Sequence, residues 1–170
     1  MGDSFSVSIK GKTQGAFKAE TTQGSAKNKI AGLSFSYEVK SPRDAATGNA
    51  SGKRQHSPVR IVKAVGAASP QIFQALVNNE VLTEVTFEFT KTNANGEEYV
   101  YYQIKLTNAS VASVRLFTKE DLSSAGGSSS KQSSSLAMEV EEVAFVFQKI
   151  EVESKDGKTM GMDDWGGPNT

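Results

Sequence analysis

The sequence predicts a mainly β protein, an antiparallel β-barrel with one short α-helix. Three observations lead to this prediction. Apolar and polar residues alternate through most of the chain, a single segment has helical spacing, and turn residues separate most of the alternating stretches. A closed or nearly closed barrel is favoured because closure leaves no exposed strand edges. The length of 170 residues fits one domain, so residues 1–170 are expected to form a single barrel domain.

The predicted helix lies within residues 67–79. Ser69 is a suitable N-cap, and Pro70 suits the first helical position, where its missing N–H costs nothing. Asn78 and Asn79 are a plausible end. Apolar side chains recur at i, i+1, i+4 and i+5, which places them on one face that is expected to pack in the core. The residues of that face are Ile72, Phe73, Leu76 and Val77.

The first half of the chain contains three alternating stretches, residues 4–10, 33–40 and 59–63, each predicted to be a strand. Residues 40–57 separate the second from the third and have no periodicity. A polar segment of this length inside a compact domain is usually functional or disordered, and it is predicted to be an extended loop. Its charged or titratable residues include Arg43, Asp44, Lys53, Arg54 and His56.

The second half begins with a predicted β-hairpin, in which residues 84–90 and 99–106 are joined by the turn sequence of residues 93–96. A second turn is predicted at Thr107–Asn108, followed by a strand over residues 109–117.

Residues 122–135 are rich in Ser and Gly and are predicted to be a flexible loop. A last strand, apolar on both faces, is predicted over residues 136–152, with a phase shift at Glu141–Glu142 that indicates a β-bulge. The C-terminal tail, residues 160–170, is expected to be surface-bound or frayed.

Composition excludes several classes of function. Lys and Arg number 19, as do Asp and Glu, so the net charge is zero; nucleic-acid binding and attachment to anionic membranes are therefore not expected. A neutral chain opposes self-association only weakly. The chain has no cysteine, which excludes disulfides, thiolate catalysis and Cys-ligated zinc. Charged residues interrupt residues 1–20, so no signal peptide is predicted, and no apolar stretch is long enough to cross a membrane.

No catalytic, cofactor-binding or metal site is predicted. His56 is the single histidine and is interpreted as a surface residue. The serines lack a nucleophile-elbow pattern, and the glycines lack a phosphate-loop pattern. Asp163–Asp164 is interpreted as a solvated acidic pair rather than a cation site. The carboxylates at 139, 141 and 142 are given a structural or interface role in preference to acid–base catalysis.

The order of several segments resembles the Hcp family, the haemolysin-coregulated tube protein of the bacterial type VI secretion system. Residues 67–76 are similar to the family's Ala-Ser-Pro-x-Leu/Ile-Phe helix start, and residues 141–150 to its Glu-Glu-Val-x-Phe-x-Phe-x-Lys-Ile strand. Residues 33–37, 52–59 and 102–109 resemble three further family segments in the same order. Together these segments extend over nearly the whole chain.

The resemblance implies a structural subunit rather than an enzyme. Members form a β-barrel with a helix, assemble into hexameric rings and stack into a tube inside a contractile sheath. The tube carries a VgrG spike and secreted effectors. The expected partners are therefore other copies of this chain, VgrG, sheath proteins and effectors, with no cofactor. Synthesis is expected in the cytoplasm, followed by export without a signal peptide.

Within this scheme the loop of residues 40–57 is expected to project and contact the next ring. Its polar side chains suit reversible stacking contacts. The proposed contact residues are Arg43, Asp44, Lys53, Arg54 and His56.

Two alternatives remain. One is a monomeric β-barrel that binds a small molecule in an apolar cavity. The other, an enzyme with an unrecognised site, is disfavoured by the single histidine and the absence of cysteine. Oligomeric state separates the alternatives, because a carrier barrel is a monomer whereas a tube subunit forms a ring.

Overall fold

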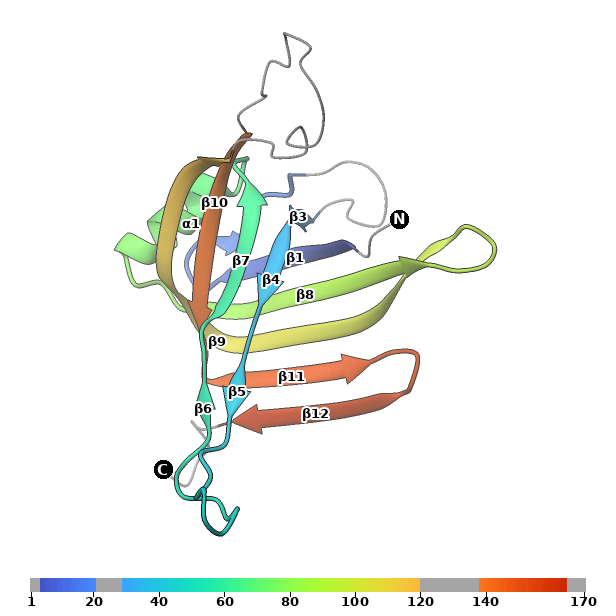
Figure 1. Cartoon of the computed structure of the whole chain (residues 1–170). Coiled ribbons are helices and arrows are strands. Elements are labelled where there is room, and N and C mark those ends of the chain that lie inside the picture. Colours follow the sequence, from blue (N-terminus) through green and yellow to red (C-terminus); the bar gives the residue numbers. More distant parts are fainter. Residues whose placement is uncertain (1–3, 21–28, 120–137, 165–170) are drawn as a thin grey trace, which may run out of the picture.

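The computed structural model describes residues 4–20, 29–119 and 138–164. They form an antiparallel sheet that curves into a barrel, with a single described helix beside it (Figure 1). The first elements are β1 (Ser4–Gly11), β2 (Gly15–Ala16), β3 (Ile30–Gly32), β4 (Ser34–Ser36), β5 (Val39–Lys40), β6 (Gln55–His56) and β7 (Val59–Ala64). The helix and later strands are α1 (Ser69–Val77), β8 (Leu82–Thr92), β9 (Glu98–Lys119), β10 (Met138–Val146), β11 (Lys149–Ser154) and β12 (Thr159–Asp164). The predicted mainly antiparallel β fold with a short helix is confirmed.

A strand that changes partner connects the two ends of the sheet. The main path of paired strands is β1-β8-β9-β10-β7-β4. Segment 30–36 pairs with β1 through its first half, β3, and with β7 through its second half, β4. Between the halves, the Leu33 amide donates to the Val62 carbonyl at 2.8 Å. The described sheet therefore has no continuous closing ladder, but one split strand links both ends.

Strand β9 is continuous through the position where the sequence predicted a turn. Asn108 has a left-handed backbone with a φ of 49°, and the Gln148 amide donates to the carbonyls of Thr107 and Asn108. The first half of β9 pairs with β8 and β11, and the second half pairs with β10. The predicted turn is thus wrong, because the left-handed residue bends the strand without ending its pairing.

The predicted strand over residues 136–152 is two strands. β10 ends at Val146 and β11 begins at Lys149 on a different part of β9. The predicted bulge at Glu141–Glu142 is also wrong, since the register shift lies between Ala144 and Phe145. Position 141 faces inward, where an apolar residue was expected, but it holds a buried glutamate that pairs with Lys63. The apolar alternation therefore changes phase at Glu141.

Part of the predicted tail is ordered as a strand. β12 pairs with β11 along its whole length, from Lys149–Asp164 to Ser154–Thr159. Of the two alternatives for the tail, residues 160–164 are therefore surface-bound rather than frayed. Residues 165–170, with Trp165, lie outside the described residues, as does the Ser/Gly-rich loop of residues 122–135.

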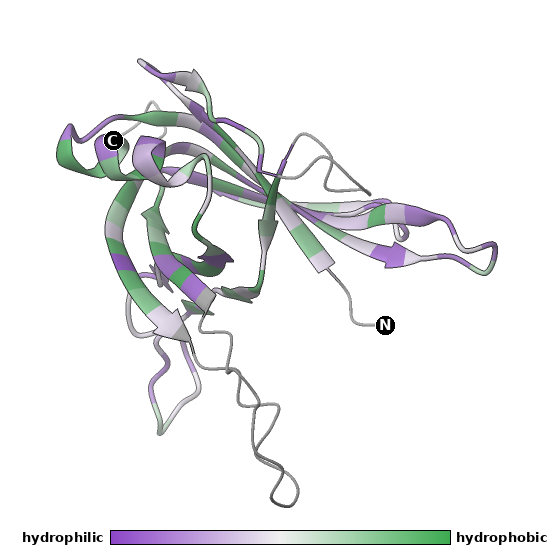
Figure 2. Cartoon of the chain, turned by 90° about the horizontal axis from the view of Figure 1, so that it is seen from above, coloured by the Kyte–Doolittle hydropathy of each residue, from purple (hydrophilic) through white to green (hydrophobic). Residues whose placement is uncertain are grey.

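Phenylalanine rings fill the barrel interior. Phe35 lies with its ring centroid 5.2 Å from that of Phe87 and 5.1 Å from that of Phe89, both edge-on, and Phe87 contacts Phe145 in the same way. Apolar and polar residues alternate along the strands as predicted (Figure 2). The predicted strand 33–40 is interrupted, however, because β4 and β5 are separate and the side chain of Leu33 is exposed.

The helix begins one residue earlier than predicted, and its buried face is narrower. Ala68 is the N-cap without a side-chain hydrogen bond, so Ser69 is already helical. Ile72 and Ala75 are buried, whereas Phe73 is 58% exposed and Val77 is 53% exposed. The assignment of these two side chains to the core is wrong in the single chain, because at about 100° per residue Phe73 and Val77 point away from the face that carries the buried Ile72 and Ala75.

The predicted end of the helix is confirmed, with Asn78 as the C-cap and Asn79 at a φ of 50°. Leu76 is half-buried against the core. Among the described residues, no helix is long and apolar enough to cross a membrane.

Candidate functional site

The polar segment of residues 39–56 forms a narrow arm that projects from the barrel, and we call it the arm (Figure 1). β5 and β6 pair at its base, and Arg43 forms a bridge with Ala50 further out. The tip is closed by Asp44, whose carboxylate accepts from the amides of Ala46 and Thr47 at 2.7 and 3.2 Å. The segment predicted to be a loop is therefore extended and internally hydrogen-bonded, which suits a projecting contact element.

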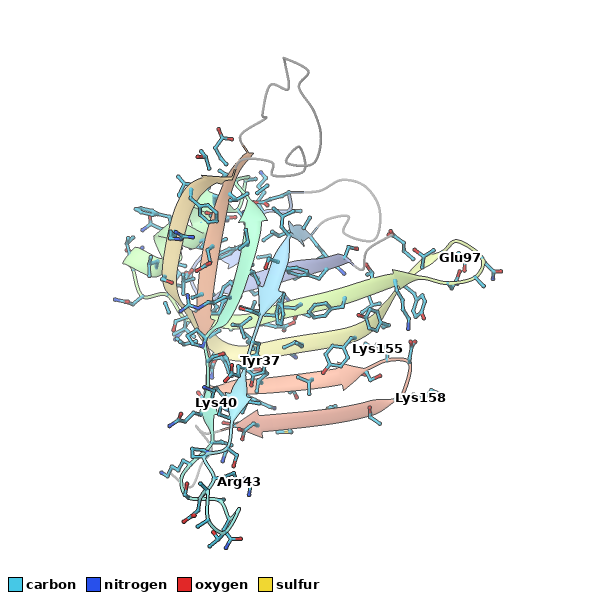
Figure 3. All side chains as sticks on the ribbon, viewed as in Figure 1. Tyr37, Lys40, Arg43, Glu97, Lys155 and Lys158 are labelled. Carbon is cyan, nitrogen blue, oxygen red and sulfur yellow. The ribbon has the colours of Figure 1, made fainter. Side chains whose placement is uncertain are left out.

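The five residues predicted to contact a neighbouring ring fall into two groups. Arg43, Asp44 and Lys53 are exposed along the arm, and Figure 3 shows Arg43 well away from Tyr37 at the arm's base. Arg54 and His56 instead point back to the C-terminal strand. The interpretation of His56 as a surface residue is wrong, because its side chain is only 10% exposed.

Asp163 on β12 joins the arm to the barrel. Its Oδ2 accepts from Arg54 Nε and from His56 Nε2, the latter at 2.7 Å. The other ring nitrogen of His56 lies 2.5 Å from the Tyr37 hydroxyl, and the imidazole meets the Phe147 ring edge-on at 5.7 Å. We call Tyr37, Arg54, His56, Phe147 and Asp163 the arm-base cluster.

Charge and burial set the protonation of this cluster. Hydrogen bonding from Arg54 lowers the pKa of Asp163, with a further contribution from His56, and together they outweigh the opposing effect of burial. Burial raises the pKa of Tyr37, and the Asp163 charge adds to this. A carboxylate can only accept, so Nε2–H of the imidazole donates to Asp163, and Nδ1 is hydrogen-bonded to the Tyr37 hydroxyl. Both ring nitrogens are engaged, which suits positioning rather than proton transfer to a substrate.

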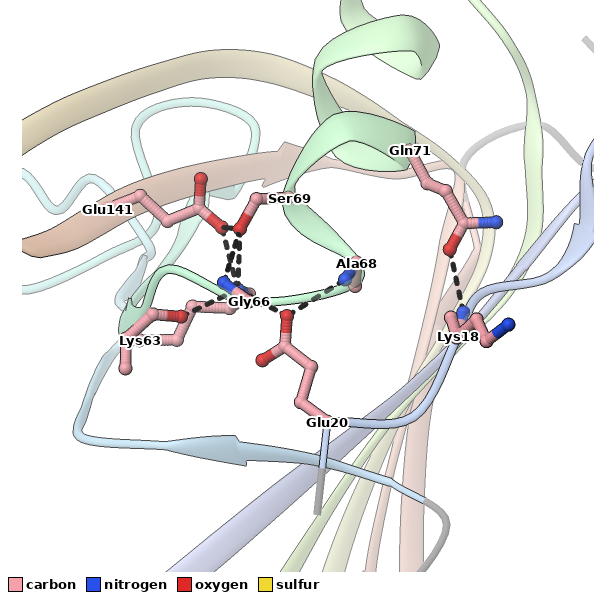
Figure 4. A network of polar contacts seen from close by, with 9 residues as sticks. Lys18, Glu20, Lys63, Gly66, Ala68, Ser69, Gln71 and Glu141 are labelled. Atoms are coloured by element: carbon pink, nitrogen blue, oxygen red, sulfur yellow. Dashed lines mark hydrogen bonds and ion pairs between the residues drawn. The ribbon is translucent and has the colours of Figure 1, made fainter.

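A second charged cluster lies buried where the helix begins (Figure 4). Lys63 Nζ is 2.9 Å from Glu20 Oε1 and 2.7 Å from Glu141 Oε1. Ser69 Oγ donates to Glu141 at 2.7 Å and accepts from the Gly66 amide at 3.0 Å. We call Glu20, Lys63, Ser69 and Glu141 the helix-start network. Lys63 is fully buried and is matched by two carboxylates, so the network fixes the helix against β7 and β10.

Sequence reasoning missed the ion pair of this network, although a signal was present. Lys63 occupies the inward position that follows Val59 and Ile61, and Glu141 occupies the equivalent position before Val143. The two are direct cross-strand partners. Opposite charges at inward positions of two neighbouring strands predict a buried pair once the pairing is known.

A third buried carboxylate holds the other end of the helix. Glu80 accepts from the amides of Thr13 and Gln14 at 2.9 and 2.8 Å, and from the Gln14 side chain at 2.9 Å. Burial opposes ionisation of Glu80, but these hydrogen bonds outweigh it and lower its pKa. The carboxylate therefore ties the β1–β2 turn to the link between α1 and β8.

The chain leaves many large apolar side chains exposed. Two of them, Phe73 and Val77, lie on the helix, and two, Met160 and Met162, lie on β12. Within residues 4–20, 29–119 and 138–164, the exposed large apolar residues are Leu33, Val39, Val65, Phe73, Val77, Val81, Leu116, Val146, Met160 and Met162. Phe73 and Val77 are one helical turn apart, so their exposed side chains lie side by side on the outer face of the helix.

The described part of the chain has no group of three or more His, Asp or Glu side chains placed to hold a metal ion. Asp163, considered above as half of an acidic pair, is directed to Arg54 and His56.

Comparisons with known proteins agree with one another. The family described as "Type VI secretion system effector, Hcp" matches residues 7–153. The "Major exported protein" of Pseudomonas aeruginosa is 30% identical over 162 residues, which cover 92% of this chain and 88% of that protein.

Solved structures have the same fold. A crystal structure of an Hcp protein superposes with a TM-score of 0.81 at 22% identity, covering 97% of this chain and 100% of that one. The secreted protein Hcp3 of Pseudomonas aeruginosa superposes with a TM-score of 0.73 at 25% identity, covering 96% and 99%.

Proposed function

The chain belongs to the Hcp family of the type VI secretion system, and on that premise we propose that it is the structural subunit of the secretion tube. Six copies close a ring through one interface repeated around an axis, and rings stack into a tube. The tube is expelled with its VgrG spike from within a contractile sheath and carries effectors. The protein is made in the cytoplasm and exported, and its role is assembly rather than catalysis.

The observation that carries the proposal is the exposed apolar surface on a fold whose interior is already filled. Phe35, Phe87 and Phe145 pack in the barrel, which disfavours the alternative of a ligand-binding cavity there. Phe73 and Val77, outside it, are available to a second copy. Zero net charge lets identical subunits approach without long-range repulsion.

Size and shape in solution test the proposal. A ring of six 18.2 kDa subunits has a mass of about 109 kDa and is annular in negative-stain images. Size exclusion with light scattering measures the mass directly. A monomer at high protein concentration would overturn the ring and favour the carrier barrel.

The exposed helix face provides a variant for the ring interface. Phe73→Ser removes apolar area that the single chain does not bury, so the rings are expected to dissociate while the thermal midpoint of the monomer is unchanged. Gln74→Ser, at the neighbouring exposed position, is the matched control. Intact rings in the Phe73 variant would place the ring interface elsewhere.

The arm is proposed to contact the next ring. Its exposed Arg43, Asp44 and Lys53 supply polar contacts of the kind that form and separate reversibly. Because the Ser51 amide donates to the Pro42 carbonyl at 2.9 Å, residues 43–50 can be replaced by Asn-Gly without disturbing the arm's base. Filament length in electron micrographs is expected to fall while rings persist. Filaments without intact rings would contradict this assignment.

A further inference from the structure

The arm-base cluster joins the projecting arm to the last strand of the fold. We infer that Asp163 is a latch that holds the arm in its projecting orientation, so that ring stacking depends on the C-terminal hairpin β11–β12. The inference rests on the proposed role of the arm in stacking. It assigns Asp163 a positioning role rather than a contact with the next ring.

The strand topology explains why the orientation of the arm depends on the contact with Asp163. β5 and β6 form a separate two-stranded sheet of two residue pairs, Val39–His56 and Lys40–Gln55. Such a short ribbon does not hold its own direction in water. β12 belongs to the main sheet, because it pairs with β11 and β11 pairs with β9. Contact with Asp163 therefore fixes the base of the arm to the main sheet.

The hydrogen bonds to Asp163 determine the direction in which the arm projects. One carboxylate oxygen accepts from both Arg54, which directly precedes β6, and His56, which ends β6 two residues later. Alternate residues of a strand project to the same side, so one acceptor can hold both side chains. The opposite strand contributes Tyr37, which precedes β5 and binds the second nitrogen of His56. Asp163 therefore contacts one strand of the arm directly and the other through His56.

Contacts with two aromatic side chains also orient the imidazole of His56. The imidazole lies nearly parallel to the Tyr37 ring, at an angle of 20°, and edge-on to Phe147, at 81°. Phe147 is buried and directly follows β10, in the two-residue link that leads to β11. The imidazole is therefore held between the arm and the core, and its Nε2 is directed at β12.

Amide hydrogen exchange tests the latch without requiring assembly. Asp163→Asn removes the charge while keeping the side-chain shape, and amides of residues 39–56 are expected to exchange about tenfold faster. The matched control is Asp156→Asn, in the turn of the same hairpin, where the carboxylate pairs with Lys91 at 2.8 Å. Exchange in β1 and β8 reports whether the fold is intact.

Arg54→Met removes the partner from the arm side and gives a second measurement. If the latch acts as inferred, the double variant with Asp163→Asn exchanges no faster than the faster single variant, because Asp163→Asn already weakens the contact that Arg54→Met removes. Additive effects, or arm exchange equal to that of the control, would overturn the latch.

Stacking is then compared among the same variants by electron microscopy. The Asp163 variant is expected to form rings with shortened or absent filaments, and the Asp156 variant to form filaments like the unchanged protein. Normal filaments with a loosened arm would overturn the dependence of stacking on the hairpin. If the unchanged protein forms no rings at all, the proposed function fails, while the exchange result still decides whether Asp163 holds the arm.

Discussion

The helix-start network and the arm-base cluster contain the same kinds of charged groups in different surroundings. In the first, Lys63 is fully buried and Glu141 is 5% exposed. In the second, Asp163 is 24% exposed and Arg54 is 51% exposed. Water can replace a lost partner in the exposed cluster but not in the buried one. The comparison indicates that the buried network determines whether the helix and barrel fold together, whereas the exposed cluster adjusts a projecting element.

Removing the buried cation is the strongest test of this comparison. Lys63→Met keeps the length of the side chain but leaves two carboxylates without their counter-charge, and a loss of about 3–5 kcal/mol in the free energy of unfolding is expected. Urea denaturation followed by circular dichroism measures it. Lys40→Met, at a position whose side chain is 70% exposed, is the control and should be nearly neutral. If Lys63→Met lowered the free energy of unfolding by less than about 1 kcal/mol, the buried network would contribute no more to stability than an exposed ion pair does.

Neutralising one carboxylate in each cluster directly compares what the two clusters contribute to the free energy of unfolding. Glu141→Gln weakens two charged hydrogen bonds at a buried site and is expected to cost about 1–3 kcal/mol, whereas Asp163→Asn should cost about 1 kcal/mol or less. Both variants are measured in the same urea series. Equal costs, or a larger cost at Asp163, would show that exposure does not separate the clusters.

Lowering the pH is expected to give the smallest of these effects on stability, and the one most specific to the charge of Asp163. The pKa of Asp163 is lowered in the folded protein, so its stabilising contribution is complete above the unfolded value of about 3.9 and is lost as the pH falls through the folded value. The stability difference between the unchanged protein and Asp163→Asn should therefore shrink between about pH 5 and pH 2. A difference that stays constant over this range would contradict a charged latch.

The sequence determined the class of fold and most of its strands. Alternation located β1, β7, β8 and β10, and the turn signals of residues 93–96 located the β8–β9 hairpin. These features were predictable because each depends on residues close together in the chain. The family segments gave the order of the whole domain, and the matched range of residues 7–153 agrees with it.

Only the tertiary structure decided which side chains meet. The sequence predicted a turn at Asn108, because a left-handed asparagine occurs both in turns and in bends within a strand. The pairing of β9 with β11 and β10 decided in favour of the bend. Glu141 resembled a bulge until its cross-strand partner was known to be Lys63. His56 and Asp163 are separated by 107 residues, so no local pattern could connect them. Such contacts depend on register and strand order, which short-range periodicity does not encode.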